Sequence, residues 1–302
     1  MQVIAINELT KKFNNQKALV NVNAMITKHS IFGLLGSNGS GKSTLLRSIA
    51  GIFPADTGQI QWNGQDVFEN MEFKSKLFFV PDEPFFFPHS HLDQMAGFYR
   101  KFHQNWDDEE YKKLLDTFQI NPRMTLTSFS KGMKRQAMLI LSLSASPEYL
   151  LLDEAFDGLD TVMCNVLKQI LIQKVSDKRM TVIISSHNLR DVENLCDSIC
   201  ILHQGKTAAV EQTSVFLDSL VSIQIAFKSK PDKSVFSPFQ ILHYEEIGHL
   251  VFVTMQGNAE EILLQLQAME PVFLEQIPVR LEEAFSYKME ELGYEAKYKI
   301  EE

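Results

Sequence analysis

Apolar and polar positions predict strands and helices in alternation over the first two thirds of this chain. Short apolar runs of the length of buried strands are separated by segments in which apolar residues recur every three to four positions. The predicted strands are 30–35, 77–81, 149–153, 181–185 and 198–203, and the predicted helices between them include 45–50 and 162–175. This alternation is typical of an α/β domain, to which we assign residues 1–212.

A different pattern interrupts this domain between residues 84 and 147. Strand signals stop there, and helical periodicity takes over, most clearly over 93–103 and 107–118. We therefore predict a helical subdomain inserted into the sheet domain.

The last part of the chain, 213–302, has its own pattern. Strands are predicted at 221–227, 249–255 and 271–279, and helices at 259–269 and 281–292. This mixture predicts a small α+β accessory domain that is long enough for a modest core. It contains seven Lys or Arg against fifteen Asp or Glu, so nearly all of the formal charge of −9 lies there. Because phosphate binding needs a basic face, we expect no nucleic-acid partner.

Composition favours a cytoplasmic protein. The sequence has no run of eighteen apolar residues, and its amino terminus lacks the zones of a signal peptide. Any role at a membrane then needs a partner. The three cysteines, Cys164, Cys196 and Cys200, are odd in number and lack metal-type pairing, which fits a reducing compartment.

The clearest chemical signal is a phosphate-binding loop of the pattern G-x-x-x-x-G-K-[ST], which lies between a predicted strand and a predicted helix. Its residues are Gly36, Ser37, Asn38, Gly39, Ser40, Gly41, Lys42, Ser43 and Thr44. The glycines let backbone N–H groups point at a β-phosphate, and the helix adds the positive end of its dipole. Lys42 then reaches the β- and γ-phosphates, and Ser43 offers its hydroxyl to Mg²⁺. The chain is predicted to bind a nucleoside triphosphate with Mg²⁺.

Two acids at the end of the predicted strand 149–153 suit the same chemistry. Asp153 is predicted to hold Mg²⁺ through water, and Glu154 to orient or deprotonate the attacking water. His187 follows the next predicted strand, so we expect its imidazole at the same edge, near the γ-phosphate. Plainer alternatives stay open, since acids also cap helices and a single histidine is most often structural.

Together these motifs resemble the ATP-binding-cassette family, the ATPase subunits of ABC transporters, over about residues 1–210. The most specific match is 129–133, Phe-Ser-Lys-Gly-Met, a variant of the family's Leu-Ser-Gly-Gly-Gln signature. The resemblance implies that Ser130 and the backbone around Gly132 contact the γ-phosphate held by a second copy. A helix that begins at Ser130 presents free N–H groups to an anion, although an ordinary capping serine does the same.

The resemblance extends to two weaker matches. Phe13 occupies the place of the family's adenine-stacking aromatic, with a core phenylalanine as the alternative. Residues 158–160 lie where the family has a dimer-contact loop, and Asp160 would help to arrange the opposite site. The implied fold is a P-loop NTPase domain of the ABC type.

The chain departs from the family at two places. After the strand 77–81 the family commonly has a glutamine that contacts the metal, whereas this chain has Asp82 and Glu83. We assign Asp82 to the metal site, but the sequence does not decide which of the two acids faces the nucleotide. Lys131 replaces a signature glycine, and its charge either faces the triphosphate or, as we favour, points into solvent.

By the same resemblance, aromatic residues of the helical insert mark the surface that receives short helices of membrane subunits. They are Phe85, Phe86, Phe87, Phe98, Tyr99, Phe102 and Trp106. Several are expected to form the subdomain core instead. His89 and His91 have a metal-like spacing, but no third ligand is evident.

The resemblance implies an ATP-hydrolysing subunit with Lys42, Glu154 and His187 as catalytic residues. It would pair with itself or with a related ATPase, and would lie on the inner face of the cell membrane. There it would drive transport through separate transmembrane permease subunits. Export is the favoured direction, because the tail resembles the extension of bacterial exporter subunits. Two alternatives stay open: a soluble remodelling ATPase, and a nucleotide-switched binding module without turnover.

Overall fold

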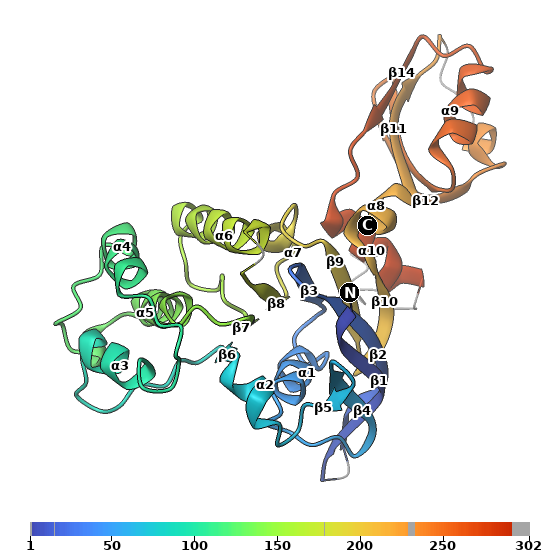
Figure 1. The fold of residues 1–302 in the computed structure, drawn as a ribbon. Coiled ribbons are helices and arrows are strands. Elements are labelled where there is room, and N and C mark those ends of the chain that lie inside the picture. Colours follow the sequence, from blue (N-terminus) through green and yellow to red (C-terminus); the bar gives the residue numbers. More distant parts are fainter. Residues whose placement is uncertain (1, 15, 178, 229–232, 292–302) are drawn as a thin grey trace. The chain divides into compact units, whose positions relative to one another are not determined.

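The computed structural model describes residues 2–14, 16–177, 179–228 and 233–291. The chain divides into two compact units, Met1–Val210 and Glu211–Glu302. Figure 1 follows the chain through them, from the blue amino-terminal strands to the red carboxyl-terminal helix. The predicted boundary after residue 212 lies close to this division, while the ability of each part to fold alone remains a prediction.

The first sheet of the amino-terminal unit is antiparallel, in the order β2-β1-β4-β5. Its strands are β1 (Gln2–Phe13), β2 (Gln16–Thr27), β4 (Thr57–Trp62) and β5 (Gln65–Asp66). The pairing of β1 with β2 shifts register between Ile6 and Leu9. Such irregularities break the alternation of apolar and polar residues, which explains why the sequence pattern does not single out these two strands.

The second sheet has the order β10-β9-β3-β8-β7-β6. Its strands are β3 (Ile31–Leu35), β6 (Leu77–Val80), β7 (Tyr149–Asp153), β8 (Thr181–Ser186), β9 (Ser198–His203) and β10 (Lys206–Gln212). The five strands from β9 to β6 are parallel, and β3, β7 and β8 are buried throughout. Because parallel strands end at one edge, the residues that follow β3, β6, β7 and β8 meet there.

Helices complete the layers of this unit. They are α1 (Lys42–Ile49), α2 (Met71–Ser75), α6 (Thr161–Ser176) and α7 (Leu189–Val192). Leu45, Leu46 and Ile49 of α1 belong to an apolar cluster that contains residues of both sheets. The indole Nε1 of Trp62 also donates a hydrogen bond of 3.0 Å to the hydroxyl of Tyr149, joining the first sheet to the second.

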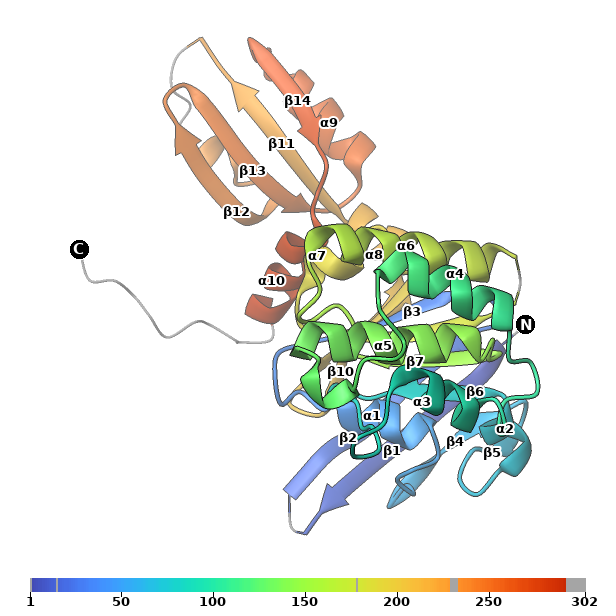
Figure 2. The ribbon, with the colours of Figure 1, turned by 90° about the vertical axis from the view of Figure 1, so that its left-hand side faces the viewer.

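The helical insert contains α3 (Leu92–Tyr99), α4 (Asp108–Phe118), the short 3₁₀ helix η1 (Leu126–Ser128) and α5 (Lys131–Ser144). Figures 1 and 2 both show α3, α4 and α5 grouped together. Helix α3 ends at Tyr99 and not at the predicted His103. The N–H groups of Lys101 and Phe102 bond to carbonyls only three residues back, which tightens the chain into turns.

The carboxyl-terminal unit is an antiparallel sheet in the order β12-β13-β11-β14, packed with helices. Its elements are α8 (Thr213–Asp218), β11 (Leu220–Ala226), η2 (Lys233–Phe236), β12 (Gln240–Ile247), β13 (Leu250–Gln256), α9 (Ala259–Gln267), β14 (Phe273–Ile277) and α10 (Leu281–Glu291). Residue 292, the end of the last predicted helix, lies outside the described residues. The sequence pattern misses β12 because most of this strand is exposed and its register shifts between Ile241 and His243, so the residues that pack on the core, Ile241 and Tyr244, do not alternate.

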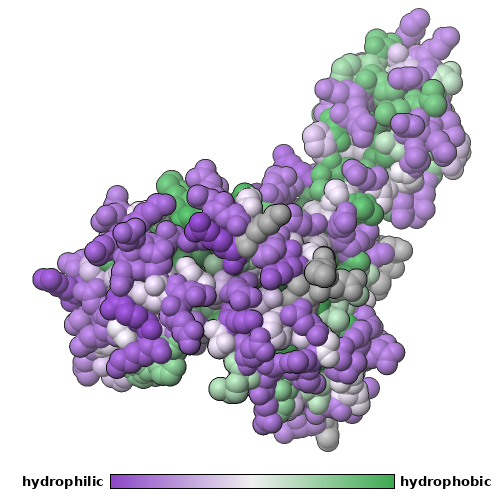
Figure 3. All heavy atoms as spheres, in the orientation of Figure 1, coloured by the Kyte–Doolittle hydropathy of each residue, from purple (hydrophilic) through white to green (hydrophobic). Residues whose placement is uncertain are grey.

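Figure 3 shows a face on which hydrophilic side chains predominate. Among the described residues, no helix combines the length and the apolar character that a membrane span needs. Cys164, Cys196 and Cys200 are all buried, and burial raises the pKa of both Cys196 and Cys200 to about 12. Protonated, buried thiols of this kind are unreactive.

Candidate nucleotide site

The phosphate-binding loop connects β3 to α1 and depends on glycine at two close contacts. Gly36 has φ 151°, and a Cβ there would lie 2.4 Å from the carbonyl oxygen of Leu202. Gly41 has φ 109°, and its Cβ would lie 2.8 Å from the carbonyl oxygen of Ala18. Only glycine adopts these backbone angles without strain, so the loop conformation follows from its composition.

Lys42 is the first residue of α1 and is only 5% exposed. Its Nζ donates to the carbonyl oxygens of Gly36 at 2.7 Å and Ser37 at 3.2 Å. The same Nζ lies 3.2 Å from Oε1 of Glu154. The ammonium group is therefore held at the loop, between main-chain oxygens and a carboxylate.

Asp153 ends β7 with a fully buried carboxyl group. Its Oδ1 accepts hydrogen bonds from Ser43 Oγ at 3.0 Å and Ser185 Oγ at 2.8 Å. Within the described part of the chain, its buried Oδ2 has no hydrogen-bond partner. Burial raises the pKa of Asp153, against the opposing effect of the two serine hydroxyls. A buried carboxylate oxygen without a donor, beside a serine hydroxyl, suits a hard cation such as Mg²⁺.

Glu154 directly follows β7 with φ 50°, a left-handed conformation that is uncommon for residues other than glycine. Its backbone N–H donates to Ser185 Oγ at 3.0 Å. Its Oε2 lies 2.8 Å from Nδ1 of His187 and accepts from the backbone N–H of His187 at 3.2 Å. The Glu154 carboxylate thus bridges Lys42 and His187, and strain at this position fits a functional role.

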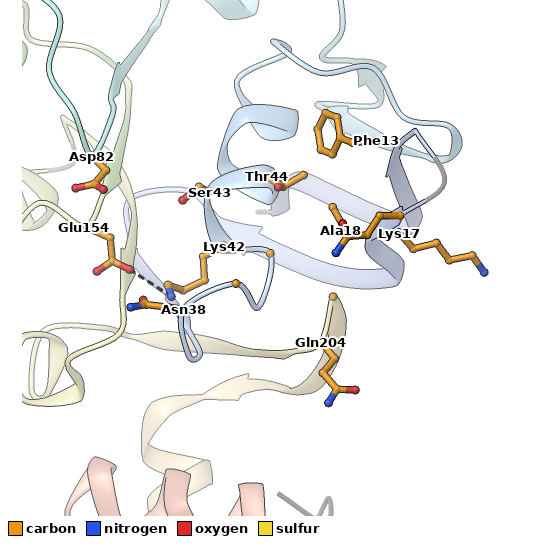
Figure 4. A pocket seen from close by; sticks show the side chains of 14 residues that line it. Phe13, Lys17, Ala18, Asn38, Lys42, Ser43, Thr44, Asp82, Glu154 and Gln204 are labelled. Atoms are coloured by element: carbon orange, nitrogen blue, oxygen red, sulfur yellow. Dashed lines mark ion pairs between the residues drawn. The ribbon is translucent and has the colours of Figure 1, made fainter.

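A cavity of about 600 Å³ opens at this edge, within the size range of small-molecule sites. The predicted site residues that line it are Phe13, Asn38, Gly39, Gly41, Lys42, Ser43, Thr44, Asp82 and Glu154. In Figure 4, Asp82 and Glu154 lie on one side and Phe13 on the other, with Lys42 and Ser43 between them. The cavity therefore runs from an aromatic end to an acidic end past the phosphate-binding loop.

Phe13, the last residue of β1, is 42% exposed, which rules out the core alternative. Its ring makes an edge contact with Phe53, with centroids 5.1 Å apart. Other wall residues were not predicted, including Lys17, Ala18 and Gln204. Lys17 and Ala18 lie in β2 and Gln204 lies in the turn after β9. Main-chain contacts such as Val20 N–H to Gly205 O at 2.7 Å bring these segments together, and no local motif signals such contacts.

The signature residues lie elsewhere. Ser130 caps α5, where its Oγ accepts from the N–H of Met133 at 3.2 Å, and neither Ser130 nor Gly132 lines the cavity. Lys131 is exposed, as favoured, and its Nζ lies 2.6 Å from Oδ2 of Asp157. Asp160 caps α6 through the N–H of Met163 at 2.9 Å. One chain thus does not bring its signature to its own phosphate-binding loop.

The two acids after β6 are distinguished by the structure. Asp82 lines the cavity, whereas Glu83 is exposed and is not among the lining residues. Oδ1 of Asp82 accepts a hydrogen bond of 2.8 Å from Nη2 of Arg135. Sequence reasoning missed Arg135, because its burial and its partner depend on how α5 packs on the ends of β6 and β7, which no local motif states.

The structure does not add a third metal ligand to His89 and His91. In the described ranges, no group of three or more His, Cys, Asp or Glu side chains is placed to hold a metal ion.

Comparison with known proteins resolves the family. A family model described as "ABC transporter" matches residues 19–157. The ABC-type transporter ATP-binding protein EcsA of Bacillus subtilis is 31% identical over 216 residues, which cover 69% of this chain and 87% of EcsA. This chain belongs to the ATP-binding subunits of ABC transporters. The ABC transporter ATP-binding protein YtrB of the same species is 29% identical over 286 residues, 95% of this chain and 98% of YtrB.

A solved structure titled as an ATP-binding subunit of an ABC transporter resembles this ABC subunit with a TM-score of 0.65. At 24% identity, covering 71% of this chain and 91% of that one, the likeness concerns the fold. The predicted family, the α/β fold of the ABC type and the function as an ATP-binding transporter subunit are confirmed. Membership implies that this ABC subunit binds and hydrolyses ATP. The roles of individual residues remain predictions.

Proposed function

We propose that the cavity at the edge of the parallel sheet is a Mg²⁺-dependent ATPase site that drives export. The observation that carries the proposal is the convergence of Lys42, Ser43, Asp153, Glu154 and His187 through direct contacts. These residues come from three strand ends that are distant in sequence. Their types are those that phosphoryl transfer to water requires.

The sequence also assigns Asp82 to the metal, but its Oδ1 accepts a hydrogen bond of 2.8 Å from Nη2 of Arg135, and it is not proposed as a ligand. The residues proposed to hold the metal are Ser43 and Asp153. The unpartnered Oδ2 of Asp153 supports this role, as does the Ser43 hydroxyl 3.0 Å from Oδ1. When bound, Mg²⁺ would neutralise charge on the β- and γ-phosphates. The phosphates themselves bind the main-chain N–H groups of 36–44 and the ammonium group of Lys42.

Glu154 is the general base, which accepts a proton from the attacking water. Its two carboxylate oxygens are each held by a partner, Oε1 by Lys42 and Oε2 by His187, so the group is oriented before substrate binds. His187 is 45% exposed at its side chain and lines a neighbouring cavity that shares Glu154 with the nucleotide cavity. From there it would approach the γ-phosphate while fixing Glu154. Phe13 stacks on the adenine at the far end of the cavity.

A second ATPase subunit completes the site, in a homodimer or a heterodimer. Ser130 and Gly132 lie outside the cavity of their own chain, at the first turn of a fourteen-residue helix. The N–H groups of that turn suit the γ-phosphate bound by the partner. Asp160 would approach the same junction.

Separate transmembrane permease subunits are the proposed membrane partners, so that this chain lies on the inner face of the cell membrane. A row of four phenylalanines in the helical insert supports the contact: Phe85, Phe87, Phe98 and Phe102 are 69%, 44%, 37% and 62% exposed. Their neighbouring rings lie 6.0, 5.1 and 4.9 Å apart in that order. A continuous aromatic row suits the apolar face of a short helix. Phe86, Tyr99 and Trp106 are less exposed, and the rings of Tyr99 and Trp106 pack on Phe78 of β6 and Tyr111 of α4.

The test is ATP hydrolysis by the purified full chain with Mg²⁺ and after its removal by EDTA. We expect release of phosphate only with Mg²⁺, and co-purification of a multi-spanning protein from gently solubilised membranes. Hydrolysis that persists without any divalent cation would contradict the metal role. Retention of soluble partners alone would contradict the transport role.

A further inference from the structure

Arg135 is the largest fully buried side chain among the described residues, with no exposed surface. A buried guanidinium is costly unless charges and hydrogen bonds compensate it. Arg135 stands in the second turn of α5, and its guanidinium donates three hydrogen bonds to residues at or just after the ends of β6 and β7, while its buried Nε has no partner among the described residues. Nη2 donates to Asp82 Oδ1 at 2.8 Å, and Nη1 donates to the carbonyl oxygens of Asp153 at 3.2 Å and Pro81 at 3.4 Å.

These contacts place one cation behind the acidic end of the nucleotide cavity. Pro81 and Asp82 directly follow β6, and Asp153 ends β7. Asp82 is 46% exposed and lines the cavity, so its carboxylate faces the nucleotide space on one side and Arg135 on the other. Asp153 and Glu154 already supply two carboxylates at this end. A third, uncompensated anion there would repel the terminal phosphate of ATP.

We propose that Arg135 is a positioning residue that neutralises Asp82 and fixes its carboxylate. The γ-phosphate can then bind next to this acidic side chain. The inference rests on the proposed function, because it takes the acidic end of the cavity as the γ-phosphate end. Arg135 is expected to raise the affinity for ATP relative to the affinity for ADP. The γ-phosphate is the group nearest to Asp82, and ADP lacks it.

The experiment compares Arg135→Met with wild type by equilibrium binding of a non-hydrolysable ATP analogue and of ADP, both with Mg²⁺. In Arg135→Met the ratio of the two affinities should fall about tenfold, the size of one uncompensated charge in a half-exposed site. Asp82→Asn in the same chain should restore the ratio. Arg123→Met, which removes an exposed loop arginine, is the matched control and should leave the ratio unchanged.

An unchanged ratio in folded Arg135→Met would overturn the proposal, and so would a lowered ratio that Asp82→Asn does not restore. If Arg135→Met does not fold, two other variants decide. Arg135→Lys keeps the charge and should keep the ratio, whereas Asp82→Asn alone should raise it several-fold; the opposite result in either overturns the proposal. Failure of the wild type to bind the ATP analogue would instead contradict the proposed function.

Discussion

Four charged side chains are buried in the amino-terminal unit, namely Lys11, Lys42, Arg135 and Asp153. The described part of the carboxyl-terminal unit buries only two polar side chains, Ser222 and Thr254, whose hydroxyls bond to each other at 3.1 Å. Burying charge opposes folding, so a domain that contains several such groups is adapted for chemistry and not for stability. The contrast implies that substitutions of the charged site residues in the first unit change activity, while substitutions in the apolar core of the second unit change stability.

The largest effect is expected for Glu154→Gln. Loss of a general base lowers the rate by about a hundredfold or more, while the amide keeps the shape of the side chain and nucleotide binding persists. Phosphate release and binding of a fluorescent ATP analogue measure the two properties. Glu109→Gln, at an exposed position of α4, is the matched control. If Glu154→Gln hydrolysed ATP at the wild-type rate, Glu154 would not be the general base, and the assignment of the first unit's buried charges to catalysis would lose its main support.

The converse test lies in the second unit. Ile223→Ala removes a fully buried side chain from the core of β11 and should lower the free energy of unfolding by about 2–4 kcal/mol. Denaturant unfolding measures this loss, and kcat of the folded protein should stay unchanged. Gln224→Ala, the neighbour on the opposite face of the strand, should cost far less. A large loss of kcat in Ile223→Ala would break the separation between the units.

Phe13→Ala tests the aromatic end of the cavity. Loss of stacking on the base should weaken ATP binding by about 1–3 kcal/mol and leave kcat at saturating ATP nearly unchanged. Titration with ATP separates KM from kcat. Phe68→Ala removes a phenylalanine that is 38% exposed, compared with 42% for Phe13, but that does not line the cavity. If the two substitutions changed the affinity for ATP equally, Phe13 would be an ordinary surface residue that does not stack on the adenine.

Asp153→Asn tests whether a buried carboxylate that is needed for activity lowers the stability of the folded protein. Burial raises the pKa of Asp153, so the folded state gains stability as pH falls through that pKa and loses it as pH rises. At neutral pH the nucleotide-free variant should therefore be more stable, by about 1 kcal/mol, and should lack this part of the pH dependence. Thermal unfolding from about pH 4, the ordinary carboxyl pKa, up to pH 8 measures it, with Mg²⁺-dependent hydrolysis expected to be lost. A less stable variant would show that the carboxylate is favourable where it lies.

The smallest effect is expected for Lys131→Ala. The Lys131–Asp157 pair is 66% and 41% exposed at its two side chains, and such surface pairs contribute less than about 1 kcal/mol. Unfolding should hardly change, as for the exposed Lys112→Ala on α4. A marked loss of ATPase activity would instead place the Lys131 charge at the partner's nucleotide.

The parts of the site that could be predicted are those that a short stretch of sequence specifies by itself. Three features could be assigned because each lies at the end of a predicted strand: the loop at 36–44, the acids that end β7 and the histidine after β8. Arg135 could not, because its role depends on how α5 packs on two strand ends. The same holds for Ala18 in β2 and Gln204 in the turn after β9, which reach the cavity only after the two sheets assemble. Strand β12 could not be recognised because a register shift between Ile241 and His243 breaks the alternation of its core-facing residues, Ile241 and Tyr244.

The first turn of α5, which carries Gly132, is in close contact with the loop after Glu154, and this contact limits how far the two segments can move independently. A Cβ on Gly132 would lie 2.6 Å from the carbonyl oxygen of Gly158, so the first turn of α5 and the loop after Glu154 touch main chain to main chain. No side chain lies between them to bend or change rotamer. A displacement of either segment is therefore passed to the other with little slack, as in a rigid linkage, and a single added methyl group would hold the two apart.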